Sequence, residues 1–290
     1  MDQAANLRSI IKKKNPPKFA KVITVTSGKG GVGKSNTSIN LAIQLSKQKK
    51  KVIIIDADFA LANVEILLGI RPKYNLADFL YHGKGIQDII TYGPEGIGFI
   101  SGGSGVFELV NLKKDQVTHL VQGLYELDRI ADIIIIDTGA GINDNVTEFI
   151  MVSSDVFIIV TPEPTSITDS YALLKSISKN PAFSRDNMSL KIIANNVRNE
   201  KEGMEIYQKL RIVSQKFLNM ELDFLGSIPY DESVRKAVIK QTPYSLAYTN
   251  SAASRAVKSI SEKIGMIDKK DKKKRGITHI IYDYLKNKFE

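Results

Sequence analysis

Short apolar runs alternate along the chain with longer stretches whose apolar residues recur every three or four positions. The runs of strand length are Val22–Val25, Lys51–Ile55, Ala131–Ile136, Asp155–Thr161, Leu190–Ala194 and Phe224–Ile228. Nearly continuous apolar runs are typical of parallel strands that are covered on both faces. The helical patterns between them include Asn36–Lys47, Val117–Arg129, Asn143–Ser153 and Tyr244–Ile264. This alternation predicts an α/β fold with a doubly wound, mostly parallel sheet of seven or eight strands.

A glycine-rich segment lies between the first predicted strand and the first predicted helix. It fits the phosphate-loop template of Gly, four residues, Gly, Lys and Ser/Thr, in the context where that template works. Glycines allow consecutive N–H groups to turn around an anion, and the helix N-terminus adds positive charge. The alternative is a plain strand-to-helix turn. The predicted ATP-binding residues here are Gly28, Lys29, Gly30, Gly31, Val32, Gly33, Lys34, Ser35 and Asn36.

Carboxylates follow two of the other predicted strands. Asp56 and Asp58 come after the second run, and Asp137 ends the Ala131–Ile136 run. The carboxyl ends of parallel strands meet at one edge of a sheet, where ligands bind. We expect Lys34 to reach the outer phosphates, and the Ser35 hydroxyl and Asp137 to hold Mg²⁺. Alternatively, the first two acids only cap the helix that follows them.

The composition limits the class of protein, but it does not decide between nucleic acid and a membrane as the binding partner. The chain has 290 residues, 43% of them hydrophobic and 25% charged, and no cysteine, so disulfides are excluded. No apolar run is long enough to span a bilayer, and the first residues lack a signal pattern, so we expect a cytoplasmic protein. The net charge of +10 suits either nucleic acid or an anionic membrane surface.

The second lysine of the loop gives Lys29-Gly-Gly-Val-Gly-Lys-Ser35, which resembles the deviant-Walker ATPases of the MinD/ParA family. The resemblance implies an ATP-bound homodimer in which Lys29 reaches the partner's nucleotide; the alternative is a solvated loop lysine. It also implies that Lys34 and Asp58 act in hydrolysis, with Asp58 orienting the attacking water and Asp56 supporting the Mg²⁺ shell. Relatives that carry iron–sulfur clusters on cysteines are excluded.

The same resemblance assigns several residues farther along the chain. Thr138–Gly141, with Gly139 and Gly141, matches the family's second switch. Asn195 is the expected adenine reader, with Asn196 as the other possibility, and Pro229 and Asp231 would lie nearest the base. No guanine-binding motif follows Asn196, so ATP is preferred over GTP.

The N-terminal stretch 2–12 has a narrow apolar helical face and is followed by two prolines. Its Asp-Gln-Ala-x-x-Leu-Arg pattern resembles the N-terminal motif of the FlhG family (also called YlxH or FleN), MinD-like regulators of flagellar number. In that family this helix stimulates the GTPase FlhF; the alternative is a frayed leader. The predicted partner-binding residues are Asp2, Gln3, Ala4, Leu7 and Arg8.

The last segment combines a basic run, Lys269–Arg275, with apolar residues at helical spacing. Such a pair is typical of a helix that lies on an anionic membrane surface. The alternative is a terminal helix docked on the core. The predicted membrane-contacting residues are Ile277, Ile280, Ile281, Tyr284, Leu285 and Phe289.

These patterns predict three segments: an activating helix and linker at 1–17, an ATPase domain at 18–267, and a membrane-targeting segment at 268–290. The FlhG resemblance implies an ATP-switched dimer that limits flagellar number and placement at the inner face of the membrane, with FlhF and flagellar C-ring proteins as partners. A MinD-type division-site ATPase and a ParA-type DNA-segregation ATPase are the alternatives. Binding to DNA is not expected.

Overall fold

The computed structural model describes residues 20–58, 63–103, 114–183 and 188–270. Within them the strands form one sheet in the order β3-β4-β2-β5-β1-β6-β7-β8. Every neighbouring pair is parallel except β3 and β4. The predicted fold class is confirmed. The strands are β1 (Lys21–Thr26), β2 (Val52–Ala57), β3 (Thr91–Tyr92), β4 (Gly98–Ile100), β5 (Ile133–Thr138), β6 (Asp155–Val160), β7 (Ser189–Val197) and β8 (Asp223–Pro229).

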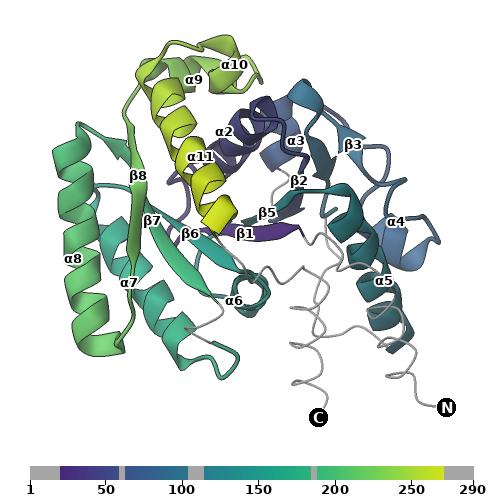
Figure 1. The fold of residues 1–290 in the computed structure, drawn as a ribbon, viewed down its shortest axis with the longest axis horizontal. Helices are drawn as coiled ribbons and strands as arrows, with labels where there is room; N and C mark the ends of the chain where they lie inside the picture. The colour runs from purple at the N-terminus through teal and green to yellow at the C-terminus, as the bar shows by residue number, and fades with distance from the viewer. Residues whose placement is uncertain (1–19, 59–62, 104–113, 184–187, 271–290) are drawn as a thin grey trace.

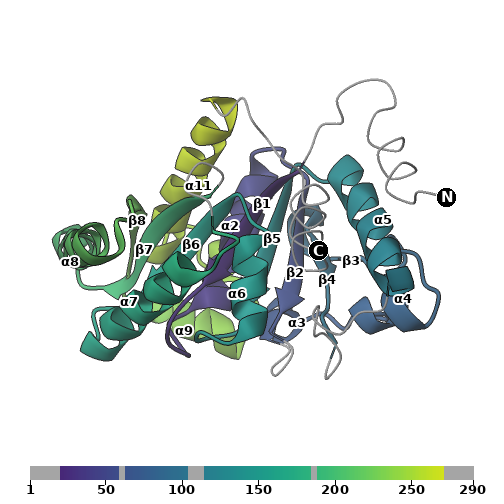
Figure 2. The ribbon, with the colours of Figure 1, turned by 90° about the horizontal axis from the view of Figure 1, so that it is seen from below.

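Helices cover both faces of this sheet (Figures 1 and 2). α2, α3, α9, α10 and α11 pack on one face, and α4 to α8 pack on the other. The helices are α2 (Lys34–Lys47), α3 (Asn63–Leu68), α4 (Leu76–Tyr81), α5 (Lys114–Ile130), α6 (Asp144–Met151), α7 (Pro164–Lys179), α8 (Glu200–Leu218), α9 (Glu232–Ile239), α10 (Tyr244–Ala247) and α11 (Ala252–Lys270), with the 3-10 turn η1 at Pro94–Gly96. None of the helices in these described ranges is long and apolar enough to cross a membrane.

The register of the central strands brings the predicted site residues to one edge of the sheet. β5 pairs with both β1 and β2, so Asp137 is the register partner of Val25 on one side and of Asp56 on the other. All six residues of each of these three strands are buried. The glycine-rich loop therefore leaves the sheet beside the two strands that carry the acids.

Two details differ from the sequence prediction. The two-residue strand β3 was not predicted, because a pattern of alternating polarity cannot be recognised over so short a run. The predicted helical stretch Tyr244–Ile264 is two helices, because Ser251 accepts a hydrogen bond from the N–H of Ser254 and starts α11 anew. The proposed division of the chain at 17/18 and 267/268 stays a prediction.

Candidate functional site

The loop between β1 and α2 adopts a conformation that its glycines make possible. Gly31 and Gly33 have φ angles of 76° and 94°, in the left-handed region that favours glycine. The carbonyl of Gly33 accepts hydrogen bonds from the N–H and the hydroxyl of Thr37, at 3.0 and 2.9 Å, and so closes the first turn of α2. The loop therefore ends on the N-terminus of a 14-residue helix, as an anion-binding loop requires.

Lys34 begins α2 and is only 7% exposed. Burial lowers the pKa of its ammonium group, while the negative charges of Asp137 and Asp58 oppose that shift. A buried ammonium at a helix N-terminus favours an anion such as a polyphosphate. The structure thus brings Lys34 together with two of the predicted acids.

Asp137 ends β5 and is fully buried. Its Oδ1 accepts a hydrogen bond of 2.7 Å from the Ser38 hydroxyl, whereas its Oδ2 has no hydrogen-bond partner among the described residues. Burial raises the pKa of this carboxyl to about 6, although the nearby hydroxyls of Ser35 and Ser38 and the charge of Lys34 oppose the increase. An unsatisfied buried carboxylate oxygen is costly unless a cation or a water meets it.

Asp56 and Asp58 lie on either side of Ala57, at the end of β2. The carboxylate of Asp56 accepts hydrogen bonds from the N–H groups of Asp58, at 3.1 Å, and Val64, at 3.4 Å. Burial, and then the neighbouring charge of Asp137, raise the pKa of Asp56 to about 8. Asp58 is half-buried and faces the second switch, since a Cβ added to Gly139 would lie 3.5 Å from its Oδ1.

This donor set fits Mg²⁺ bound together with phosphates. The Ser35 hydroxyl and the carboxylates are hard oxygen ligands, and Asp137 offers the unsatisfied oxygen. No three His, Cys, Asp or Glu side chains of the described ranges are placed to hold a metal by themselves. Mg²⁺ usually takes one or two carboxylates and completes its octahedron with phosphate oxygens and water.

The structure places the two candidate adenine readers differently, while the assignment of either one to adenine stays a prediction. Asn195 donates a hydrogen bond of 2.7 Å from Nδ2 to the carbonyl of Val32, so its side chain lies against the phosphate loop. Asn196 is exposed, with a φ of 59°. Asn195 also explains the glycine at position 33, because a Cβ there would lie 2.4 Å from its Nδ2.

Asp231 follows β8, which ends at Pro229, and both of its carboxylate oxygens are engaged by backbone. Oδ1 accepts from the N–H of Ser233 at 2.9 Å, and Oδ2 accepts from the N–H of Ala253 at 3.0 Å. Burial would raise the pKa of Asp231, but the nearby Ser233 hydroxyl, these two N–H groups and the Ser251 hydroxyl outweigh it and lower the pKa to about 2. Its carboxylate thus joins α9 to the start of α11 and positions the predicted base-side loop; the predicted contact of Asp231 with the base stays a prediction.

The second switch touches the phosphate loop. The N–H of Gly141 donates a hydrogen bond of 3.0 Å to the carbonyl of Ser27, and Gly141 itself has a φ of 98°. A ligand that rearranges the loop therefore acts on this segment through a backbone bond.

Lys29 makes contacts that the sequence did not predict. Its Nζ forms an ion pair with Glu163 Oε2 and donates a hydrogen bond of 2.9 Å to Thr165 Oγ1. These partners are 134 and 136 positions away, so no local pattern could indicate them. Lys29 is not simply solvated.

Other predicted residues lie outside the described ranges. They are Asp2, Gln3, Ala4, Leu7 and Arg8 at one end, and Ile277, Ile280, Ile281, Tyr284, Leu285 and Phe289 at the other.

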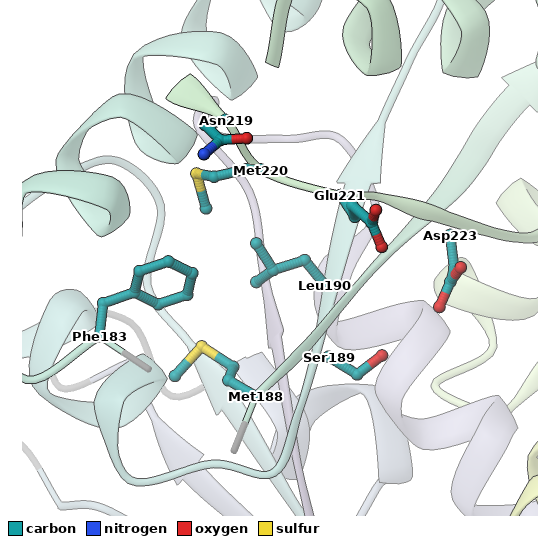
Figure 3. Close-up of a pocket in the computed structure, with 8 residues that line it drawn as sticks. All are labelled: Phe183, Met188, Ser189, Leu190, Asn219, Met220, Glu221 and Asp223. Carbon is teal, nitrogen blue, oxygen red and sulfur yellow. The ribbon is translucent and has the colours of Figure 1, made fainter. Parts of the chain in front are cut away.

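A cavity of about 310 Å³ lies away from this site (Figure 3). Phe183, Met188, Leu190 and Met220 form its apolar wall, with Glu221 beside them. The lining includes the first residues of β7 and β8, whereas the phosphate loop follows the last residue of parallel β1. This cavity therefore lies at the amino ends of the parallel strands, opposite the carboxyl ends where the phosphate loop lies.

Comparison with known proteins agrees with this geometry. A ParA family model, described as NUBPL iron-transfer P-loop NTPase, matches residues 18–265. The antiactivator FleN of Pseudomonas aeruginosa is 40% identical over 84% of this chain and 85% of its own length. The flagellum site-determining protein YlxH of Helicobacter pylori is 35% identical over 82% of this chain and 81% of its own. The fold is similar to MinD of Pyrococcus horikoshii, whose structure is a complex with Mg-ADP, with a TM-score of 0.68 and 21% identity over 88% of this chain and all of that one.

Proposed function

Because this chain belongs to the ParA family of P-loop NTPases, and within it to the FlhG group that includes FleN and YlxH, we propose that it is an ATP-hydrolysing dimerisation switch that regulates the number and placement of flagella. The observation that carries the proposal is the buried Lys34 at the end of a left-handed glycine loop, beside the strand-end acids. A ParA-type ATPase needs this arrangement to bind nucleotide and to respond to its γ-phosphate.

Each residue of the site has a distinct part in the proposed reaction. The N–H groups of the loop and the Lys34 ammonium bind and orient the phosphates, and the second lysine completes the other subunit's site. Bound Mg²⁺ would neutralise charge on the phosphates. Ser35 and Asp137 would hold that ion, and Asp56 would support its water shell. Asp58, beside the second switch, would position the attacking water.

The experiment that tests this proposal separates binding from hydrolysis. Lys34→Ala removes a direct phosphate contact and should lose ATP affinity. Asp58→Ala removes only the positioning of water, so it should bind ATP and accumulate as a dimer, visible by light scattering. Lys47→Ala, at the exposed far end of the same helix, is the matched control and should behave as the wild type. An Asp58→Ala protein that stays monomeric and turns over ATP would contradict the assignment.

The flagellar assignment rests on the FleN and YlxH similarity and on the N-terminal motif. We propose that residues 2–12 stimulate the FlhF GTPase and that C-ring proteins are further partners. A peptide of these residues should raise GTP hydrolysis by the FlhF dimer, and Gln3→Ala or Arg8→Ala should weaken that effect. If the peptide has no effect, residues 2–12 are a frayed leader without this role, and the MinD-type alternative is favoured.

The proposed location is the cytoplasmic face of the membrane. Support comes from the Lys269–Arg275 run, with six basic residues against one acid, and from the apolar spacing that follows it. ATP-dependent binding to anionic liposomes supports this location, whereas salt-sensitive binding to duplex DNA would favour the ParA-type alternative.

A further inference from the structure

Three consecutive lysines form the turn between α2 and β2 and give this turn a positive surface. The outer two, Lys49 and Lys51, are exposed. Two acids lie beside the turn. Asp132 Oδ2 accepts a hydrogen bond of 2.8 Å from the N–H of Lys51, and Glu95 pairs with Lys47 at 3.9 Å. The exposed ammonium groups at 49 and 51 are therefore the part of this surface that an anionic partner can reach.

The backbone at Lys49 has a conformation that normally selects a different residue. Its φ is 66°, in the left-handed region. The N–H groups of Lys49 and of the next residue donate to the carbonyls of Ser46 and Leu45, at 2.8 and 3.2 Å, and so close the end of α2. Glycine or asparagine usually fills this place at a helix end, because a Cβ is strained there. The chain keeps a positive charge where glycine would be more stable, which favours a role for that charge.

The lysine turn lies beside the last part of α11. Gln48 Nε2 donates a hydrogen bond of 2.8 Å to the Ser261 hydroxyl, and a Cβ added to Gly265 would lie 3.0 Å from Gln48 Oε1. Because α11 runs antiparallel to β8, it ends at Lys270 on the side of the molecule where the parallel strands begin (Figure 2). The basic run Lys269–Arg275 therefore starts on the helix that the lysine turn contacts.

An exposed apolar side chain follows this contact. Met266 comes directly after Gly265 and is 67% exposed, and the exposed acid on the same stretch of α11 is Glu262. Nucleic acid would engage the lysines through its phosphates, but an apolar side chain adds nothing to a phosphate contact. A bilayer surface offers both anionic headgroups and an apolar boundary that can bury a methionine. The combination favours an anionic membrane over nucleic acid.

We propose that the α2–β2 turn is a second, folded membrane contact, in which Lys49 and Lys51 meet anionic headgroups and Met266 enters the headgroup region. The inference rests on the proposed membrane location of the tail. Each basic residue near an anionic surface gains about fivefold in binding, so two lysines do not hold the protein there alone. Joined to the tail through α11, they add to its affinity, because their contact is then intramolecular. The turn also sets the orientation, with the amino ends of the strands toward the bilayer and the nucleotide site facing away from it.

The first test measures binding of the full chain to vesicles of phosphatidylglycerol and phosphatidylcholine, with Mg²⁺ and a non-hydrolysable ATP analogue. Lys49→Gly and Lys51→Gln should each weaken binding about three- to five-fold, and the double variant about ten- to twenty-five-fold. The differences should shrink at high salt. Lys236→Gln is the matched control, because Lys236 is an exposed lysine of α9, at the opposite ends of the strands, and it should bind as the wild type does. Equal binding of the double variant and this control would overturn the proposal.

The Lys49→Gly variant also separates loss of charge from loss of structure. Removing the Cβ at a φ of 66° should raise the urea midpoint of unfolding while vesicle binding falls. These opposite changes are expected only if the lysine is retained for its charge. A Lys49→Gly chain that loses both stability and vesicle binding would show that Lys49 acts through the fold, and would overturn its assignment.

The second test reads the orientation on the membrane. The chain has no cysteine, so one introduced cysteine can carry an environment-sensitive fluorophore. With all of the protein bound to vesicles, a probe at Met266→Cys should shift to the blue, and the shift should be smaller when Lys49→Gly and Lys51→Gln are also present. A probe at Ile212→Cys is the control, because Ile212 on α8 is similarly exposed, at 64%, and should not respond. Equal shifts at the two positions would overturn the proposed orientation.

The outcomes separate this inference from the location on which it rests. A wild-type chain that does not bind the vesicles contradicts the proposed membrane location, and the second contact is then wrong as well. A chain that loses binding on truncation after Ile267, but not in the Lys49→Gly/Lys51→Gln variant, overturns the second contact alone. If the double variant keeps vesicle binding and loses salt-sensitive binding to duplex DNA, the turn is a nucleic-acid surface and the proposal is wrong.

Discussion

Replacing Asp231 with asparagine should keep one of the two backbone hydrogen bonds that its carboxylate accepts and remove the other. Asparagine keeps an oxygen for the N–H of Ser233 and is itself a good N-cap, but its amide nitrogen cannot accept from the N–H of Ala253. We expect the free energy of unfolding at pH 7 to fall by about 1–2 kcal/mol, the cost of one hydrogen bond to a charged group. The pKa gives a consistent limit: about 2 in place of 3.8 corresponds to about 2 kcal/mol, reduced because the side chain is partly exposed.

The stabilisation by the Asp231 carboxylate should decrease as the pH falls. The folded pKa of Asp231 is below its usual value, so its stabilisation is present above about pH 4 and is lost as pH falls toward 2. The stability difference between wild type and Asp231→Asn should therefore shrink by about half between pH 5 and pH 3, because the Asp231 carboxyl of the unfolded chain takes up a proton in this range while that of the folded chain stays mostly ionised.

Urea unfolding of the nucleotide-free proteins at pH 7, 5 and 3 measures both quantities. Asn199→Ala is the control, because Asn199 caps α8 through a single bond of 3.0 Å to the N–H of Glu202. It should cost about 1 kcal/mol at every pH, since no charge is involved. Equal stability of Asp231→Asn and wild type at pH 7, or a difference that stays constant down to pH 3, would refute the reasoning.

Three further predictions concern the site and the tail. Gly33→Ala should weaken ATP binding at least about tenfold by calorimetry, because the methyl meets Asn195 and the φ is left-handed, whereas Gly83→Ala, with a φ of 68° and open space, should not. Ser38→Ala should raise the pKa of Asp137 above about 6 by removing a donor to its carboxylate, and should move the acidic limb of the ATPase pH profile upward; an unmoved limb contradicts this. Truncation after Ile267 should abolish pelleting with anionic liposomes and leave ATP binding intact, and retained pelleting would show that the tail is not the anchor.

Most of the fold followed from the sequence because buried parallel strands leave continuous apolar runs. The placement of the acids followed as well, since parallel strands end at a common edge and Asp56 is the register partner of Asp137. The loop was evident from its glycines and from the strand and helix on either side. Such features depend on local pattern and on a general rule of topology.

The features of the site that the sequence did not predict depend on contacts between residues far apart in the chain. The pairing of Lys29 with Glu163, and the bond from Asp231 to Ala253, join positions that nothing in their own segments connects. The different placement of Asn195 and Asn196 depends on the backbone of β7, where a register shift and a positive φ turn Asn196 outward. The unsatisfied oxygen of Asp137 is visible only once all its neighbours are placed.

The helix α11 is hydrogen-bonded at two points, one on the loop after β8 and one at the far end of the helix that follows the phosphate loop. Its start is bonded to Asp231 on the base-side loop, and farther along Ser261 accepts a hydrogen bond of 2.8 Å from Gln48, which follows α2 and thus the phosphate loop. A helix of 19 residues is about 28 Å long and moves as a rigid rod. A displacement of the Asp231 loop or of the end of α2 would therefore bear on the position of the whole helix. The helix ends at Lys270, the residue from which the last segment of the chain continues, so the attachment point of that segment is fixed by the same two bonds.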